Sequence, residues 1–516
     1  MPCTPTRFLH IPAIFTNSNV MSIHALFEEQ ARNHANETAV VCGERQVSYS
    51  DLDRRSNELA HLLRSYGVGP EVVVGVGAAR SIEMLVAILG IVKAGGAYMP
   101  LDPSYPLERL RLMISRTNTP LVLTTHPAPS LEALGVEILD LASQDSLIRS
   151  RSESPASCVV NDHNLLCVMY TSGSSGLPKG VGVTHSGVVR LVKDVSYVDI
   201  SPSDVFLQLA PTTFDASTFE IWAPLLNGAR LALYPHASVN VGQLKKTIRT
   251  HGVTVLWLSA GLFHRMVDDA IDIFRPIKQL IAGGDQLSAA RVRRLLETVP
   301  SCRIINGYGP TEGTTFTTCH RMTCRADVDM IVPIGTPLRR TLIHVLNEHL
   351  QKVPEGAVGE LYICGDGLAR GYINSPDLTA ERFVANPFVA DGGRMYRTGD
   401  LVRQTSSGTL VFLGRIDRQL KVRGYRIEPG EVEAALAAHP RVHDAVVVAL
   451  KEGLDDERLV AYFVPSGSPG PSSAELRAHL EKSVPTYMIP SECIAVDRLS
   501  LTENGKVNRA DLARLE

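Results

Sequence analysis

A stretch rich in glycine and hydroxyl residues has the composition of a phosphate-binding loop. It reads TSGSSGLPKG over residues 171–180 and follows the apolar run LLCVM, which has the length of a buried strand. A polyphosphate requires flexible backbone for close approach, hydroxyl donors and a cation. This loop supplies all three, so the sequence predicts a nucleotide triphosphate site that uses Thr171, Ser172, Gly173, Gly176 and Lys179.

The spacing of this loop differs from that of other nucleotide motifs. Lys179 is followed by Gly180 rather than by Ser or Thr, which excludes a Walker loop. Gly75 and Gly77 resemble the start of a dinucleotide fingerprint, but Arg80 stands where its third glycine should be. Taken alone, the loop is equally compatible with a solvated Gly/Ser linker, and the rest of the chain decides between the two interpretations.

Length and composition indicate a globular protein of more than one domain. The chain has 516 residues, of which 44% are hydrophobic and 20% charged, and its formal net charge is -3. This charge gives no electrostatic case for a nucleic acid or an anionic membrane as partner, so we expect a small-molecule ligand. The nine cysteines include no C-x-x-C pair, and the N-terminus lacks a signal peptide pattern. We therefore expect free thiols and a cytoplasmic protein.

Strand-like and helix-like segments alternate from Ile23 to about Pro333. The apolar segment Ser81–Lys93 ends at two glycines and is too short to cross a bilayer, so we expect a core helix. Residues 93–103 predict a structural turn. Ligands of parallel sheets bind where the strands end, and we expect one rim formed by the loops that begin at Thr171, Pro211, Ser259, Gly283 and Gly307.

The pattern changes twice after Pro333. Strands with tight turns, as over 341–346 and 359–364, predict an antiparallel β subdomain packed on the α/β part. The last hundred residues predict a small α+β domain with helices over 429–438 and 474–484. The expected fold is therefore α/β, with a large N-terminal domain of α/β layers and an antiparallel subdomain at 1–416, and a small mobile C-terminal α+β domain at 417–516.

Four further motifs carry a resemblance to a known family. They are GYGPTE at 307–312, YRTGD at 396–400, GRIDRQLKVRGYR at 414–426 and NGKVNR at 504–509. With the phosphate loop, and in this order, they resemble the adenylate-forming enzymes, and are most similar to the amino-acid adenylation domains of nonribosomal peptide synthetases. The resemblance covers nearly everything from Ile23 to Arg509.

The resemblance implies a reaction in two halves. An amino acid carboxylate attacks the α-phosphorus of ATP with loss of pyrophosphate, and a phosphopantetheine thiol then takes the aminoacyl group. Because the first half joins two anions, it needs cations and a metal at the phosphates. The implied roles are Mg²⁺ binding for Glu312, an α-phosphate contact for Thr311, adenine stacking for Tyr308, ribose binding for Asp400 and Arg415, and further ATP contacts for Gly284, Asn306 and Gly309.

The C-terminal motifs imply a domain movement. Lys506 matches the catalytic lysine of the family, which bridges the substrate carboxylate and the phosphate oxygens. Because Lys506 lies on the small domain, that domain must close for adenylation and can swing away afterwards. Asp417 matches the hinge of this movement. Gly424 matches the strand that lines the thiol tunnel, where the absence of a Cβ lets pantetheine pass.

Asp215, in the segment TTFDAS, indicates an amino acid substrate. A buried carboxylate without a cation is costly, so it favours a substrate ammonium group, although Asp215 could also cap a helix over 217–226. The other positions of the family's pocket are small or apolar and resemble a valine-type pocket: Ala216, Phe219, Trp257, Ile281, Gly283, Gly307, Thr315 and Phe316. We expect valine, with 2-aminobutyrate and isoleucine as neighbours.

Two alternatives are open at this point. An acyl-CoA or aryl acid ligase of the same superfamily would share the fold but should lack Asp215. A non-catalytic module of this fold should have lost Lys179, Glu312 or Lys506, and all three are present. We expect a free-standing enzyme that acts with a separate peptidyl carrier protein, and the sequence leaves open whether the chain is instead part of a longer synthetase. A small helper protein is a further candidate partner.

Overall fold

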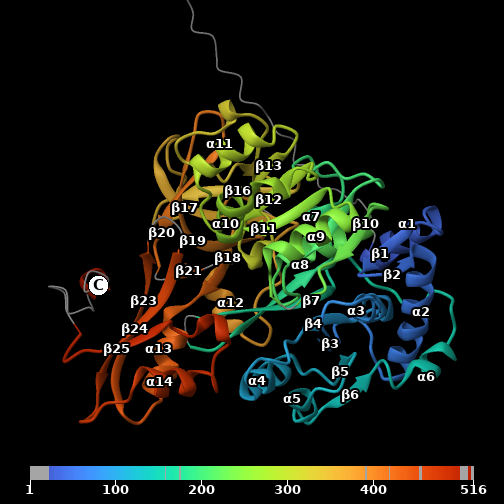
Figure 1. The fold of residues 1–516 in the computed structure, drawn as a ribbon, viewed down its shortest axis with the longest axis horizontal. Helices are drawn as coiled ribbons and strands as arrows, with labels where there is room; N and C mark the ends of the chain where they lie inside the picture. The colour runs from blue at the N-terminus through green and yellow to red at the C-terminus, as the bar shows by residue number, and fades with distance from the viewer. Residues whose placement is uncertain are drawn as a thin grey trace, which may run out of the picture.

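The computed structural model describes residues 22–156, 158–173, 176–236, 238–389, 392–417, 419–422, 424–452, 456–499 and 509–512. Two α/β sheets form the first part of the chain, and three smaller β arrangements follow (Figure 1). In the described residues no helix is long and apolar enough to span a bilayer. The described cysteines are free thiols, as expected, and Cys324 is exposed among them.

The larger α/β sheet has nine strands, in the order β15-β14-β13-β12-β11-β9-β10-β1-β2. Its central strands are parallel, and antiparallel pairs close both edges. The bounds are β1 Thr38–Cys42, β2 Arg45–Ser48, β9 Val205–Gln208, β10 Arg230–Leu233, β11 Val255–Ser259, β12 Gln279–Gly283, β13 Arg303–Tyr308, β14 Thr318–Met322 and β15 Thr336–Pro337. The predicted strands of this region are confirmed to within a few residues, except that Tyr49 begins a helix.

The second α/β sheet has six strands, in the order β6-β5-β3-β4-β7-β8. It contains β3 Val73–Gly77, β4 Ala97–Pro100, β5 Leu121–Thr124, β6 Glu137–Asp140, β7 Leu165–Thr171 and β8 Lys179–Thr184. Strand β4 lies where the sequence predicted only a turn. The glycines of β3 serve packing, since a Cβ on Gly75 would lie 2.7 Å from Leu101. This agrees with the absence of a dinucleotide fingerprint.

Helices lie between the two sheets and on their outer faces. The predicted core helix α3 (Ile82–Ala94) contacts strands of both sheets, and Trp222 of α8 donates a hydrogen bond to Tyr98 of β4. Helices on the outer faces include α4 and α5 on the smaller sheet and α9 to α11 on the larger. The remaining bounds are α1 Ile23–Asn33, α2 Tyr49–Ser65, α4 Leu107–Thr117, α5 Pro129–Glu132, α6 Asp145–Arg149, α7 His185–Val192, α8 Ala216–Leu225, α9 Val241–His251, α10 Ala260–Ala270 and α11 Ala289–Thr298.

The C-terminal third is built from antiparallel strands and a small α+β unit, as predicted. A five-stranded antiparallel sheet contains β16 Thr341–Leu346, β17 Val358–Gly365, β18 Phe383–Ala385, β19 Arg394–Gln404 and β20 Leu410–Arg415, with α12 (Pro376–Arg382) beside it. The hairpin β21 (Leu420–Val422) and β22 (Tyr425–Ile427) follows. The last unit contains β23 Val442–Glu452, β24 Asp456–Pro465, β25 Glu492–Ala495, α13 Pro429–Ala437, α14 Ser473–Leu480 and α15 Arg509–Leu512. The boundary between 416 and 417 stays a prediction.

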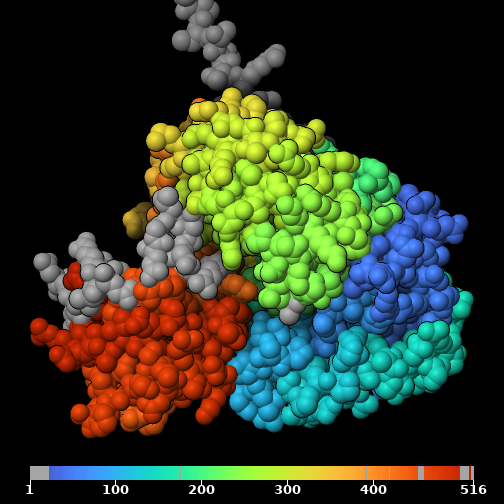
Figure 2. All heavy atoms as spheres, viewed as in Figure 1, coloured from blue at the N-terminus to red at the C-terminus, as the bar shows by residue number. Residues whose placement is uncertain are grey.

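The C-terminal unit packs against the smaller sheet's side of the molecule. Figure 2 shows its orange and red atoms directly beside the blue and cyan atoms of α4 and α5. A buried ion pair joins the two parts, because Arg109 of α4 lies 2.5 Å from Glu431 of α13. Three rings add to this contact: Phe214 meets Tyr425 edge-on at 4.7 Å, and Tyr425 stacks on Tyr487 at 4.3 Å between centroids. The β21–β22 hairpin is thereby held against the large domain's loops.

Candidate active site

The predicted rim is formed by loops from two sheets rather than one. The Thr171 loop joins β7 to β8 in the six-stranded sheet, whereas the loops after β11, β12 and β13 belong to the nine-stranded sheet. They meet at a cavity of about 120 Å³. Its lining contains these predicted residues: Thr171, Ser172, Asp215, Gly284, Tyr308, Gly309, Thr311, Asp400, Arg415 and Gly424. An adjoining cavity is lined in part by Gly284, Asn306, Gly307, Tyr308 and Gly309.

Glu312 is the centre of a buried charge network. Its carboxylate is 0% exposed and lies 3.2 Å from Lys179 Nζ and 2.7 Å from an Arg426 nitrogen. The Tyr372 hydroxyl also donates to it, at 2.7 Å. Burial alone would raise the pKa of Glu312, but the charges of Arg426 and Lys179 hold that pKa well below its usual range. Glu312 is therefore ionised.

Lys179 begins β8, so the end of the phosphate loop is fixed by strand pairing with Thr171. The Lys179 ammonium donates to the Tyr372 hydroxyl at 3.2 Å. Burial lowers the pKa of Lys179 to about 8, although the Glu312 carboxylate opposes this shift. The loop's cation is thus already desolvated and points toward the network rather than into solvent.

Asp215 directly precedes helix α8, but its side chain does not cap that helix. Its Oδ2 instead accepts a hydrogen bond from the Thr311 hydroxyl at 2.7 Å, and its carbonyl accepts one from Thr315 at 2.9 Å. Burial raises the pKa of Asp215, against the opposing hydrogen bond from Thr311. Within the described part of the chain no cation forms an ion pair with Asp215. Arg426, the cation of the neighbouring hairpin, pairs with Glu312 instead. The predicted capping role is therefore wrong.

Asp400 and Tyr308 lie together at the far side of the cavity. The Tyr308 hydroxyl donates to one oxygen of Asp400, and Arg415 donates to the other. Arg415 also binds both oxygens of Asp417, at 2.6 and 2.7 Å. Asp417, the predicted hinge, is thus tied back to the predicted ribose site, and each carboxylate oxygen of Asp400 keeps a further lone pair for a hydroxyl donor.

The phosphate loop is contacted from the C-terminal unit. The Ser172 hydroxyl donates to the carbonyl of Arg426 at 2.8 Å, and the Gly173 N–H donates to Glu431 at 3.2 Å. A Cβ on Gly176 would lie 3.2 Å from Ala434 of α13. A carboxylate therefore occupies a backbone donor that the sequence assigned to phosphate.

The predicted side-chain pocket is a cluster of packed rings. Phe219 and Phe316 lie 5.5 Å apart, and Tyr197 packs on both at 6.2 and 6.0 Å. A Cβ on Gly307 would lie 2.8 Å from the Phe316 ring, and a Cβ on Gly283 would strike the Gly307 carbonyl at 2.1 Å. Trp257 and Ile281 are register partners in the neighbouring strands, and Ala216 is buried beside Asp215. The rings fill much of the space that the sequence left beside Gly307.

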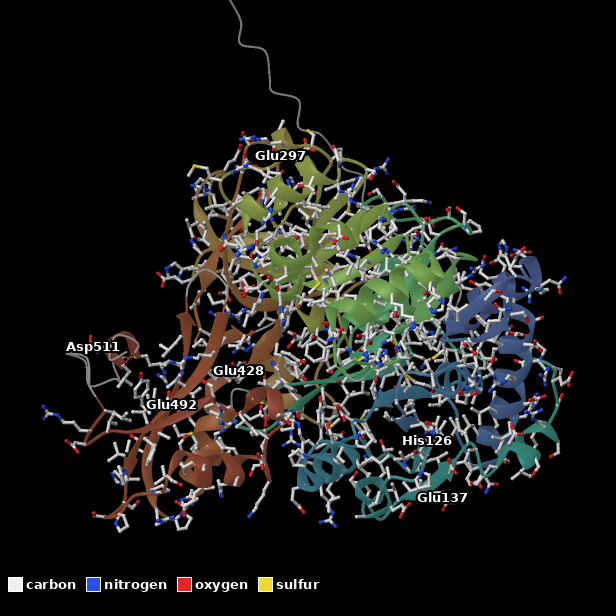
Figure 3. The ribbon with its side chains drawn as sticks, in the orientation of Figure 1. His126, Glu137, Glu297, Glu428, Glu492 and Asp511 are labelled. Atoms are coloured by element: carbon white, nitrogen blue, oxygen red, sulfur yellow. The ribbon has the colours of Figure 1, made fainter. Side chains whose placement is uncertain are left out.

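The β21–β22 hairpin enters the cavity from the C-terminal side. A Cβ on Gly424 would lie 2.7 Å from Ser259 Cβ, and Gly424 itself has a left-handed φ of 83°. Lys421 places its ammonium 5.7 Å from the centroid of the Tyr308 ring. Figure 3 labels Glu428 at this junction, where it accepts a hydrogen bond from Gln419. The predicted catalytic Lys506 lies outside the described residues.

Several residues of the site were missed from the sequence. Lys421 and Arg426 stand inside a motif that was quoted without a role for them, so a signal was present. Tyr372 and Glu431 had none, because each lies far along the chain from its partner. Glu220 had a weak signal, as a carboxylate within the otherwise apolar helix α8.

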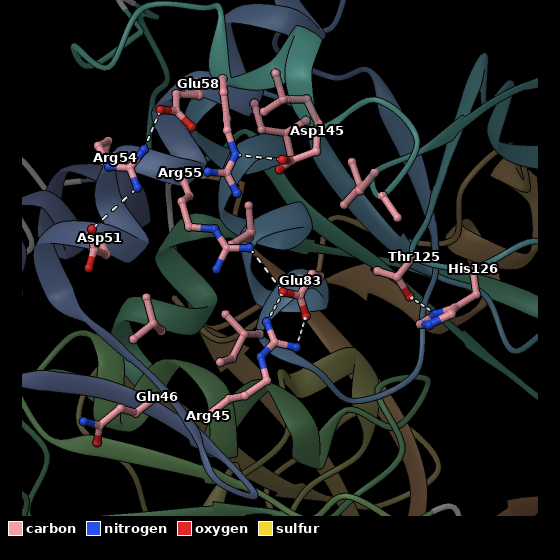
Figure 4. A pocket seen from close by; sticks show the side chains of 18 residues that line it. Arg45, Gln46, Asp51, Arg54, Arg55, Glu58, Glu83, Thr125, His126 and Asp145 are labelled. Atoms are coloured by element: carbon pink, nitrogen blue, oxygen red, sulfur yellow. Dashed lines mark hydrogen bonds and ion pairs between the residues drawn. The ribbon is translucent and has the colours of Figure 1, made fainter.

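A larger cavity lies elsewhere, between α2, α3 and α6 (Figure 4). Its volume is about 630 Å³. Arg45 and Arg55 both bind Glu83, and Arg54 binds Glu58 at 2.7 Å. Because these charges pair with one another, they give no chemistry that would compete with the site described above.

Two family descriptions match the chain. AMP-binding enzyme matches residues 27–373, and the C-terminal domain of AMP-binding enzymes matches residues 431–506. The chain is 46% identical over 492 residues to one component of the linear gramicidin synthase of Brevibacillus parabrevis, covering 95% of this chain and 10% of the relative. It is 41% identical to gramicidin S synthase 2 of Brevibacillus brevis, covering 97% and 11%. The chain thus spans about a tenth of the length of these synthases.

Solved structures share the fold. One is an NRPS protein containing adenylation and PCP domains bound to a vinylsulfonamide inhibitor, with TM-score 0.86 and 32% identity, covering 96% of this chain and 84% of that one. Another is Klebsiella oxytoca NpsA in complex with 3-hydroxyanthranilyl-AMSN, with TM-score 0.70 and 28% identity, covering 96% and 99%. The fold and the family match show that the chain belongs to the AMP-binding enzymes.

Within that family the chain belongs with the adenylation domains of nonribosomal peptide synthetases, which are ATP-dependent adenylating enzymes. This confirms the resemblance on which the sequence analysis relied, and with it the predicted fold class. The roles of single residues stay predictions.

Glu220 fixes the loop that carries Asp215. Its carboxylate accepts hydrogen bonds from the backbone N–H groups of Leu209 at 3.1 Å and Ala210 at 3.0 Å. This joins α8 to the end of β9, on either side of the loop. Burial raises the pKa of Glu220 to about 8, although these two hydrogen bonds oppose the shift.

The raised pKa of Glu220 predicts a pH-dependent stability. Because its folded pKa of about 8 lies above the ordinary value of 4.5, ionising Glu220 costs stability as the pH rises between these values. Glu220→Gln cannot titrate, so its melting temperature relative to the parent should increase with pH through this window, by about 2 °C or more. Thermal unfolding from about pH 5 to about pH 9 measures this difference. A flat or falling difference would contradict the assignment.

Proposed function

We propose that the protein activates a small aliphatic L-amino acid, valine or 2-aminobutyrate, with ATP to an aminoacyl adenylate and pyrophosphate, and then transfers the aminoacyl group to the phosphopantetheine thiol of a carrier protein. The observation that carries the proposal is Asp215. It faces the cavity, is held by Thr311, and has no cationic partner among the described residues.

An ammonium group is the substrate feature that Asp215 fits best. Burial disfavours its ionised form, and the one side-chain hydrogen bond from Thr311 leaves acceptor capacity on the carboxylate. A substrate ammonium would offset the cost of the buried charge. A fatty or aryl acid would leave the carboxylate unpaired, which argues against the alternative of an acyl-CoA or aryl acid ligase.

The phosphate end is suited to a transition state that gathers negative charge. Lys179 supplies a buried cation, and Thr171, Ser172 and Gly173 supply donors. An ionised, buried Glu312 fits a Mg²⁺ ion, which usually takes one or two carboxylates and completes its shell with phosphate oxygens and water. Glu312 would hold the ion, which would neutralise phosphate charge.

The nucleoside end follows from the neighbouring residues. We assign the ribose hydroxyls to Asp400, supported by Arg415, and the base to the space beside Tyr308, Asn306 and Gly284. Lys421 now lies over the Tyr308 ring, where we place the base. We therefore propose that the β21–β22 hairpin withdraws when ATP binds.

The described arrangement suits the second half of the reaction. Gly424 lies against Ser259, whose Cβ would be 2.7 Å from a Cβ on Gly424, and we propose that the pantetheine chain passes along this backbone. Lys506 is proposed to serve the first half, after rotation of the C-terminal domain about Asp417. The carrier is proposed to be a separate protein, and a small helper protein is a further candidate partner.

The substrate panel tests the proposed function. Pyrophosphate exchange should require an amino acid. Asp215→Ala should lower kcat/KM for the amino acid roughly 30-fold or more, which corresponds to about 2 to 5 kcal/mol of lost binding energy, because the substitution removes one partner of a buried charge pair. The KM for ATP should change little. Asp215→Asn is the matched control for shape, and it should be impaired as well because it lacks the charge. Exchange with benzoate or fatty acids but no amino acid would refute the proposal.

The rings set the size of the accepted side chain. Phe316→Ala should shift kcat/KM toward leucine, methionine or phenylalanine, because the lost ring volume becomes available to a longer side chain. In the parent, the difference in kcat/KM between valine and 2-aminobutyrate should correspond to only about 1 to 3 kcal/mol in favour of valine. A kcat/KM series over aliphatic and aromatic amino acids measures both. Phe263→Ala, a buried ring in the core on the outer face of the nine-stranded sheet, should leave the ranking unchanged; an equal shift there would show that ring loss acts only through stability.

Glu431 predicts a competition between ATP and the described arrangement. Glu431→Gln leaves Arg109 charged, buried and poorly paired, which destabilises the docked C-terminal unit and frees Gly173 for phosphate. The KM for ATP in exchange should fall, while aminoacyl transfer to pantetheine should slow. Glu433→Gln on the same helix is the control, because Glu433 pairs with Arg509 inside the C-terminal unit. Equal effects of both variants would count against the competition.

A further inference from the structure

Arg190 on helix α7 is a buried cation without a charged partner in the described part of the chain. Its side chain is 3% exposed. It donates to the carbonyls of Gly313 at 2.8 Å, Thr314 at 3.0 Å and Phe316 at 2.6 Å, and to the Thr341 hydroxyl at 3.2 Å. Burial lowers the pKa of Arg190 to about 10, so it stays charged at neutral pH. All four acceptors are neutral, and three belong to one loop.

That loop is held in an unfavourable backbone conformation. Thr314 and Thr315 have left-handed φ values of 55° and 63°, which side chains with a branched Cβ rarely adopt. Such backbone conformations are unfavourable and persist only where the surroundings fix them. The carbonyls of Thr314 and Phe316, which Arg190 binds, flank Thr315. One guanidinium therefore restrains both sides of the strained position.

Neighbouring glycines make room for this contact. A Cβ on Gly367 would lie 2.5 Å from an Arg190 nitrogen, so the guanidinium packs flat on backbone there. A Cβ on Gly187, one turn before Arg190 in α7, would lie 2.7 Å from the Thr314 hydroxyl. That hydroxyl donates to the Gly367 carbonyl at 2.8 Å. The loop is thus enclosed by α7 on one side and by the segment after β17 on the other.

The residues that the loop delivers are those that border Asp215. Thr315 donates to the Asp215 carbonyl, and the Phe316 ring lies against Gly307 and Phe219. A displacement of the loop would move this wall, whereas Glu312, which directly precedes Gly313, is also held by Lys179, Arg426 and Tyr372. The position of Phe316 therefore depends on a residue that contacts no substrate.

We propose that Arg190 is a positioning residue that determines amino acid specificity, by fixing from behind the loop that carries Thr315 and Phe316. The inference deepens the proposed function and rests on it for its kinetic consequences. A lysine at this position has a single point charge and cannot bind carbonyls on both sides of Thr315 at once. Loss of the Arg190 guanidinium should let Thr315 and Phe316 move, which enlarges the space for the side chain of the substrate.

The test compares Arg190→Lys and Arg190→Met with Lys93→Met. Lys93 is the matched control because it is also a buried cation, 1% exposed, paired with Asp53 and Asn57 far from the loop. For each variant kcat/KM is measured over alanine, 2-aminobutyrate, valine, leucine and phenylalanine, together with the KM for ATP. We expect Arg190→Lys to reduce discrimination between valine and leucine about tenfold, the value of one group in an apolar pocket. The KM for ATP should change less than this discrimination, because Lys179, Arg426 and Tyr372 also hold Glu312 in place.

Hydrogen exchange provides a readout that does not need activity. Peptides covering residues 313–317 should exchange faster in both Arg190 variants than in the parent, and at the parent's rate in Lys93→Met. Faster exchange with lost discrimination supports the proposal. Unchanged discrimination, or an equal loss in Lys93→Met, overturns it. If the parent shows no amino-acid-dependent pyrophosphate exchange, the proposed function fails. The hydrogen-exchange rate of residues 313–317 still decides whether Arg190 positions the loop.

Discussion

The ionised carboxylate of Glu312 is the constraint on which the site depends. It lies in a region from which water is excluded, where an unpaired charge is very costly, so it requires Lys179, Arg426 and Tyr372 around it. These partners come from β8, β22 and the loop before α12. One buried charge therefore fixes the phosphate hairpin, the antiparallel part and the C-terminal hairpin relative to the turn that carries Thr311.

The same electrostatics make the arrangement reversible. Arg426 is brought by the β21–β22 hairpin, and the hairpin is held by contacts at its edges, including Arg109 with Glu431 and the rings of Phe214, Tyr425 and Tyr487. A strongly anionic ligand offers Lys179 and the loop's N–H groups another partner. Charge introduced by the substrate can thus replace charge supplied by the protein, which favours a site assembled from movable parts.

The sequence predicted the elements well where hydrophobic pattern alone decides them. The core helix α3 and the strands β9 to β13 were identified because they are apolar runs ended by Gly or polar residues. Strand β4 was missed, since its four residues lie between Gly and Pro and read as a turn. The division of the rim between two sheets was not predicted, because strand pairing between distant segments leaves no local signal.

Site residues divide along the same line. Asp215, Glu312 and Asp400 were found through motifs; Asp215 and Asp400 line one cavity, and Glu312 is buried next to Thr311 of its lining. Glu431 and Tyr372 could not be found, because their significance exists only when Gly173 or Glu312 is next to them. The role of Asp215 as a helix cap was a reasonable local expectation, and it failed because a hydroxyl from Thr311, almost a hundred residues away, takes its oxygen.

The division of the site between two sheets has a consequence for how such a protein can change. The proposed wall around the amino acid is built on the nine-stranded sheet and its loops, whereas the β7–β8 hairpin, which carries the predicted phosphate loop, belongs to the six-stranded sheet. Substitutions at Trp257, Ile281 or Phe316 act on packing within one layer and leave the pairing of β7 with β8 intact. Selection for a new substrate can therefore change the packing of these side chains while the strand pairing that places Lys179 is inherited unaltered.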